Sequence, residues 1–344
     1  MLFTHIVFCS ASDCVSRESS PGSSFLNISF ALLLGAAYIY LGATLEGLVN
    51  GAPPSWGIAF FAILLGAYRA LYWIPYQLSG GRALGESSRT SLVYEVIIAL
   101  MPAFAGLTLI AVPFAPLRLL FGAAVFAAIS LIPLIAVKDS SENFSWSYGR
   151  SLSEFLADRH TALRIESILQ GIQGAVLFLV WPLAIFLIVG SDYQLLGYIL
   201  TATLVAVLFL RTFWRGFMRK TGLEHSTTAH VATSVSGWAL RLFAWTPVVI
   251  FIADSYSHAT APRRTFTLDA SVLEQAADSG SFVDEYTALK EIGLACGRII
   301  IAAVFAVLLF ATTLPVAFAT VLIVAALASA ASIILERRVA PSRY

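Results

Sequence analysis

The stretch IESILQGIQGAVLFLVWPLAIFLIV, residues 165–189, decides the fold class, because its 25 residues carry a single charged side chain, Glu166. A helix of about 20 apolar residues crosses the roughly 30 Å hydrocarbon layer of a bilayer. Apolar residues make up 58% of the 344-residue chain, and charged residues only 12%. The sequence therefore predicts an all-α, polytopic bundle of transmembrane helices.

Similar apolar runs recur along the chain and predict about ten membrane spans. Their expected ranges are 25–47, 57–78, 92–112, 116–137, 165–189, 193–213, 228–243, 246–262, 288–310 and 312–335. The seventh span is short and rich in Thr and Ser, but fusing it with the eighth would export Arg263 and Arg264. With ten spans and both termini cytoplasmic, most of the 21 basic residues fall in cytoplasmic segments, as the positive-inside rule requires.

The connections between the spans predict the domain organisation. The long segment 138–164 is expected to be a cytoplasmic linker between two bundles. The expected parts are an N-terminal tail (1–24), a bundle of four helices (25–137), the linker (138–164), a bundle of six helices (165–335) and a cytoplasmic tail (336–344).

Composition and motifs exclude several classes of function. A net charge of +1, without a basic run or a Gly-rich phosphate loop, gives no reason to expect nucleic acid as a partner. The three cysteines and five histidines have no metal-ligand spacing, so neither a metal nor another cofactor is expected. We expect a protein that is not an enzyme, whose partners are the lipid bilayer and a small-molecule solute.

The second expected span contains RALYWIPY, residues 69–76, in which Arg69, Tyr72, Trp73 and Tyr76 share one helical stripe. A guanidinium among aromatic rings suits an anionic or aromatic solute. The alternative is that Arg69 pairs with Glu95 on the next span while the aromatic side chains anchor the membrane interface. We predict a substrate pathway lined by these side chains.

The fifth span carries a second polar stripe, Glu166, Gln170 and Gln173, on one helical face. Gln170 and Gln173 are expected to line the pathway where the two bundles meet. Alternatively, they form interhelical hydrogen bonds of the kind that join membrane helices.

The eighth and ninth expected spans carry the remaining candidate residues. Asp254 and His258 lie in the eighth span, and Gly293 and Gly297 lie in the ninth. Asp254 and His258 lie one turn apart and are candidates for proton coupling, whereas the alternative is that Asp254 pairs with Arg263 or Arg298. Gly293 and Gly297 form a G-x-x-x-G pattern that predicts close helix packing.

Several motifs together resemble a bacterial branch of the major facilitator superfamily over about residues 57–310. They are YWIPY, FSWSY in the central loop, WP in the next span, TP followed by IFIADSY, and EQAADSGSFVDEYTALKEIGLACGR. The loop RTFWRGFMRK keeps the closing Arg219 and Lys220 of a family signature, with Arg215 where the family has an acid.

This resemblance implies a secondary transporter with two pseudo-repeated bundles that exposes a midplane site to each side of a bacterial inner (plasma) membrane in turn. The ten spans would match the third to twelfth helices of the family, so the N-terminal half is incomplete. The alternatives are a truncated, non-transporting remnant or membrane scaffold, and a membrane-embedded lipid or glycan enzyme. For a transporter, we expect Arg69, the Gln170 and Gln173 stripe and Asp254 to converge on one polar cavity.

Overall fold

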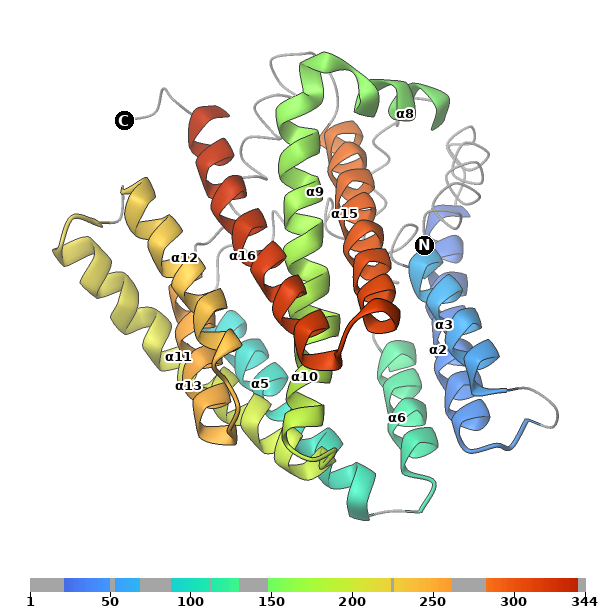
Figure 1. The fold of residues 1–344 in the computed structure, drawn as a ribbon. Helices are drawn as coiled ribbons and strands as arrows, with labels where there is room; N and C mark the ends of the chain where they lie inside the picture. The colour runs from blue at the N-terminus through green and yellow to red at the C-terminus, as the bar shows by residue number, and fades with distance from the viewer. Residues whose placement is uncertain are drawn as a thin grey trace. The chain divides into compact units, whose positions relative to one another are not determined.

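The computed structural model describes residues 22–49, 53–68, 88–111, 113–129, 148–223, 226–261 and 283–339. Every regular element in these ranges is a helix (Figure 1). The elements are α2 (Gly22–Leu45), α3 (Pro54–Tyr68), α5 (Ser88–Ala111), α6 (Ala115–Ile129), α8 (Tyr148–Leu156), η3 (Asp158–His160), α9 (Thr161–Ala175), η4 (Val176–Val180), α10 (Trp181–Ile188), α11 (Tyr193–Lys220), α12 (Thr227–Leu242), α13 (Pro247–Thr260), α15 (Val283–Ala311) and α16 (Leu314–Val339). The predicted all-α class is confirmed for these residues.

Four helical segments in the described ranges are long and apolar enough to cross a membrane, which indicates an integral membrane protein. They are Asp158–Ile188, Tyr193–Lys220, Ala288–Ala311 and Leu314–Leu335. The prediction of ten spans is therefore not matched. Helices α12 and α13 have 16 and 14 residues. At 1.5 Å per residue these two helices reach about 24 Å at most, which is short of the hydrocarbon thickness.

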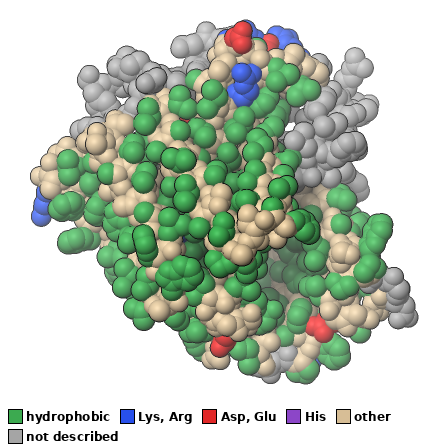
Figure 2. Space-filling view, viewed as in Figure 1, with side chains coloured by type: hydrophobic (Ala, Val, Ile, Leu, Met, Phe, Trp, Pro, Cys, Tyr) green, Lys and Arg blue, Asp and Glu red, His purple; other side chains and the backbone are tan. Residues whose placement is uncertain are grey.

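Large apolar side chains cover much of the described surface. On the face shown in Figure 2, hydrophobic side chains predominate. Phe178, Phe213 and Phe310 are 80%, 75% and 94% exposed, and each belongs to one of the membrane-length segments. Exposed aromatic side chains on such helices are compatible with contact to lipid rather than to water.

The chain divides into two compact units. The first comprises residues 1–88 and 108–151, and the second comprises residues 89–107 and 152–344. Most of α5 groups with the C-terminal part. The amide of Ala103 in α5 donates to the Thr201 hydroxyl of α11 at 2.9 Å, which ties the two helices together.

In the first unit, α2 packs against both α3 and α6. A Cβ atom at Gly42 of α2 would lie 2.8 Å from the Cα of Leu117 in α6, so only glycine permits this approach. The rings of Tyr40 in α2 and Phe60 in α3 lie 5.2 Å apart in an edge-to-face arrangement, which is favourable for aromatic pairs.

In the second unit, α9 contacts α15 and α16, and the three helices lie side by side (Figure 1). Ser167 and Gly171 of α9 face Gly293 and Gly297 of α15. A Cβ at Gly293 would lie 1.9 Å from the Ser167 hydroxyl, and one at Gly171 would lie 2.3 Å from the carbonyl oxygen of Leu294. Two small-residue patterns therefore meet, and the G-x-x-x-G pattern lies at a close helix contact.

The helix that begins at α9 continues through the π-helical turn η4 into α10. Pro182 lies in the first turn of α10 and has no amide hydrogen to donate to the preceding turn. A π-helical turn beside a proline is a common way to absorb this lost bond. The turn places Trp181 in the core of the second unit, which includes Val176, Val180, Trp181, Ile185, Trp238, Ile250 and Val321.

Helices α12 and α13 are separate elements, as the sequence predicts for the seventh and eighth spans. The Thr246 hydroxyl accepts a hydrogen bond from the amide of Val249, and Pro247 begins α13. Proline is favoured in a first helical turn, where its missing donor has no consequence. The break brings α13 back against α12.

The described part of the predicted linker, residues 148–164, is largely helical. It contains α8, η3 and the first turn of α9, which begins at Thr161 instead of the expected 165. The Arg164 guanidinium donates to the carbonyl oxygen of Phe155 at 3.1 Å, and Glu154 pairs with Arg159. These bonds fix the end of α8 to the start of α9.

Candidate functional site

A buried ion pair joins the α12–α13 hairpin. Nε of Arg241, in the last turn of α12, donates to Oδ1 of Asp254 in α13 at 2.8 Å. The two side chains are only 1% and 2% exposed. Taking two charges out of water is costly, and the cost is offset only when their mutual geometry and further hydrogen bonds are good.

Two tryptophans complete the surroundings of this pair. Nε1 of Trp181, on α10, donates to the same Oδ1 of Asp254 at 2.8 Å. The guanidinium carbon of Arg241 lies 5.5 Å from the ring centroid of Trp181 and 4.7 Å from that of Trp238. Both distances are within the range of cation–π attraction, which is stronger where water is excluded. The positive charge is thus held by one carboxylate and two indole rings.

One nitrogen of this cluster has no hydrogen-bond partner among the described residues. Nη2 of Arg241 is buried and makes no hydrogen bond to any residue that the structure describes. A guanidinium has five N–H donors, and leaving one unsatisfied in an apolar interior costs free energy. An arrangement of this kind can accept an oxygen-bearing group at Nη2 without breaking the existing pair.

His258 extends the cluster toward α11. It lies one turn after Asp254, is partly buried, and interacts electrostatically with Arg241, Asp254 and Arg211. Its predicted role with Asp254 in proton coupling stays a prediction. The alternative partners of Asp254 were Arg263 and Arg298, whereas the structure pairs it with Arg241; Arg263 lies outside the described residues.

The α9 stripe forms a second, separate polar cluster. Nε2 of Gln173 donates to the Ser332 hydroxyl of α16 at 3.1 Å, and Nε2 of Gln170 lies 3.4 Å from the carboxylate of Glu166. Glu166 itself is 5% exposed. Gln173 thus makes the interhelical bond that the alternative interpretation expects, and its partners differ from those of Asp254.

The aromatic stripe of the second expected span cannot be placed. Arg69, Tyr72, Trp73 and Tyr76 lie outside the described residues. Glu95, on α5, is partly buried. The proposed pathway along this stripe, its alternative pairing with Glu95 and its convergence with the other polar groups therefore stay predictions.

Sequence reasoning assigned no role to Trp181, Trp238 or Arg241. The available signal was a cation just before a Thr-Pro turn and an acid in the following helix. Such a hairpin brings the two charges together, but no spacing rule points to Trp181, which precedes them by 60 residues or more.

No group of three or more His, Cys, Asp or Glu side chains that could hold a metal ion occurs in the described part of the chain. Neither the protein-family models nor the curated proteins contain a match to this sequence. The resemblance to the major facilitator superfamily consequently rests on the sequence motifs.

Proposed function

We propose that this chain is a secondary transporter that moves a small polar solute across a membrane by alternating access. The observation that carries the proposal is the Arg241–Asp254 pair, enclosed by two indole rings in the unit that also holds the four membrane-length segments. Ionisable groups buried in the interior of a helical membrane protein are expensive and typically mark solute or ion pathways.

The chemical class of the solute follows from Nη2 of Arg241, the donor without a hydrogen-bond partner among the described residues. Nη2 of Arg241 offers an N–H group in a dry environment. A carboxylate, phosphate or sulfonate oxygen would satisfy it, and a guanidinium binds such groups well. The proposed solute is therefore small and anionic, and it would share the Arg241 guanidinium with Asp254. Shared binding of this kind allows proton uptake by Asp254 or His258 to be coupled to solute binding.

The same proposal places the protein in the inner membrane of a bacterium, with both termini in the cytoplasm. This orientation is supported by the concentration of Lys and Arg in the connecting segments. The motif resemblance to the major facilitator superfamily is compatible with it.

The test is uptake into proteoliposomes from a panel of radiolabelled carboxylates, organic phosphates and sulfonates, with neutral sugars as a comparison. We expect at least one anion to accumulate above the level in protein-free liposomes. Asp254→Asn should reduce this uptake about tenfold or more, whereas Arg118→Gln, at an exposed arginine of α6, should not. Folded protein that moves no anion of the panel would contradict the proposal.

A further inference from the structure

Helix α8 (Tyr148–Leu156) has three distinct faces. At about 100° per residue, Leu152 and Leu156 lie about 40° apart on one face, and Glu154 lies about 160° from both of them. Phe155 is on a third face, between Glu154 and Leu152. Phe155 is 6% exposed, whereas Leu152 and Leu156 are 41% and 63% exposed. The Phe155 face therefore packs on the protein, and the described part of the chain leaves the leucine face open.

The face opposite the leucines is charged. Glu154 pairs with Arg159, whose side chain is 63% exposed. Arg150 lies one turn before Glu154 on the same face and is exposed. In Figure 2, acidic and basic side chains gather around the corner between α8 and α9, above a surface that is mainly hydrophobic. An apolar face opposite a charged face is typical of a helix that lies flat in a membrane interface.

The segment that follows α8 gives its level in the membrane. The membrane-length segment Asp158–Ile188 begins two residues after Leu156 and has 31 residues. At 1.5 Å per residue it is about 46 Å long, close to the roughly 40–45 Å of a bilayer together with its headgroup layers. When this segment spans the bilayer symmetrically, Asp158 and the end of α8 lie at the level of the lipid headgroups.

The chain turns sharply between α8 and this segment. Ala157 has an extended backbone, with φ of −64° and ψ of 143°. The Arg164 guanidinium donates to the carbonyl oxygen of Phe155 at 3.1 Å, which holds the end of α8 at the start of α9. Figure 1 shows α8 running across the axis of α9. A helix that crosses a membrane span at headgroup level lies parallel to the membrane plane.

We propose that α8 is an interfacial helix, which lies in the headgroup layer with Leu152 and Leu156 inserted among the lipid acyl chains. Interfacial helices bury their apolar face about 5–10 Å into the boundary between headgroups and acyl chains. Lipid is the occupant of the leucine face, because this face lies at the level where the next segment of the chain enters the bilayer. The inference needs only that Asp158–Ile188 spans a membrane, and it is independent of transport.

Site-directed spin labelling of the full chain in phosphatidylcholine liposomes tests this proposal. The background is a variant in which the three native cysteines are replaced by serine. A nitroxide is attached to Arg150→Cys, Leu152→Cys or Leu156→Cys, all at exposed positions of α8. Molecular oxygen concentrates in hydrocarbon, whereas nickel ethylenediaminediacetate stays in water. The ratio of collision rates with oxygen and with nickel should be severalfold higher at 152 and 156 than at 150, on the opposite face.

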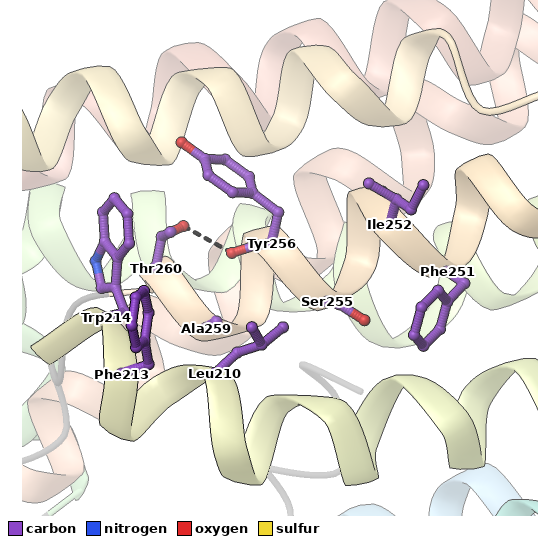
Figure 3. Close-up of a pocket in the computed structure, with 9 residues that line it drawn as sticks. All are labelled: Leu210, Phe213, Trp214, Phe251, Ile252, Ser255, Tyr256, Ala259 and Thr260. Carbon is purple, nitrogen blue, oxygen red and sulfur yellow. Dashed lines mark hydrogen bonds between the residues drawn. The ribbon is translucent and has the colours of Figure 1, made fainter. Parts of the chain in front are cut away.

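A label at Phe213 of α11 is the control for membrane insertion. Phe213 lines an apolar groove between α11 and α13 (Figure 3), is 75% exposed and belongs to a membrane-length segment, so Phe213→Cys should give a high ratio. A high ratio at 213 with equally low ratios at 150, 152 and 156 would place the leucine face in water and overturn the proposal. Immobilised labels at 152 and 156 that neither reagent reaches would show that protein covers this face, which would also overturn it.

Discussion

The ion pair of the α12–α13 hairpin makes a quantitative prediction about stability. Asp254→Leu removes the carboxylate and leaves the Arg241 guanidinium buried, with neither Nε nor Nη2 bonded to a described residue. Breaking a buried pair from one side costs about 3–5 kcal/mol, because an uncompensated charge remains in the interior. The Trp181 indole loses its acceptor in the same change, which adds about 1 kcal/mol. Arg241→Met should cost about 3–5 kcal/mol, since it leaves a buried carboxylate.

The double variant Arg241→Met/Asp254→Leu should be more stable than either single variant. It buries no charge, and apolar replacement of buried ion pairs is commonly neutral or stabilising by about 1–4 kcal/mol. With the Trp181 indole still unpaired, the free energy of unfolding should remain within about 2 kcal/mol of the wild type.

The assay is reversible unfolding of the purified protein in mixed micelles, followed by circular dichroism, as a double-mutant cycle. Arg118→Met, at an exposed arginine, serves as the control and should change stability by no more than about 0.5 kcal/mol. Single variants that each lose less than about 1 kcal/mol, or a double variant whose loss is the sum of the two, would refute the reasoning that the charges are buried and mutually dependent.

Two further predictions concern helix contacts in the second unit. Gly297→Ala should lower the free energy of unfolding by about 1–3 kcal/mol, because its Cβ would lie 2.1 Å from the backbone of α9. Gly174→Ala serves as the control and should be tolerated, because its Cβ meets nothing within 4 Å. Similar melting temperatures for the two variants would contradict the close contact at Gly297. Gln173→Leu should lower the free energy of unfolding by about 0.6–1.7 kcal/mol, because it loses the hydrogen bond to Ser332. Gln170→Leu loses only a long hydrogen bond within its own helix and should cost less in the same unfolding assay. The reverse order would contradict the assignment of Gln173 to the contact between α9 and α16.

The helical class and several helix boundaries could be predicted from the sequence, because both depend on local patterns. The charge distribution predicted that the seventh and eighth spans are separate, and the structure places the break at Thr246 and Pro247, where a capping hydroxyl and a first-turn proline specify a helix start locally. The G-x-x-x-G pattern likewise pointed to the residues where α15 approaches α9.

Other features depend on packing between distant segments, and the sequence did not specify them. Hydropathy counts apolar residues but does not say which runs cross the bilayer, and among the described residues four segments, not ten, are long and apolar enough to do so. Asp254 was recognised as a buried acid, but its partner depends on how the hairpin closes. Trp181, on α10, donates a hydrogen bond to the carboxylate of Asp254. Its position depends on the π-helical turn η4, which an apolar run in the sequence does not predict.

The most direct test of the account is anion uptake by proteoliposomes that contain the Arg241→Met/Asp254→Leu variant, compared with the wild type at equal amounts of folded protein. If the pair serves solute movement rather than stability, the wild type should accumulate an anion, and the variant should lose uptake about tenfold or more while keeping its free energy of unfolding within about 2 kcal/mol. Undiminished uptake by a stable double variant would contradict a transport role for Arg241 and Asp254.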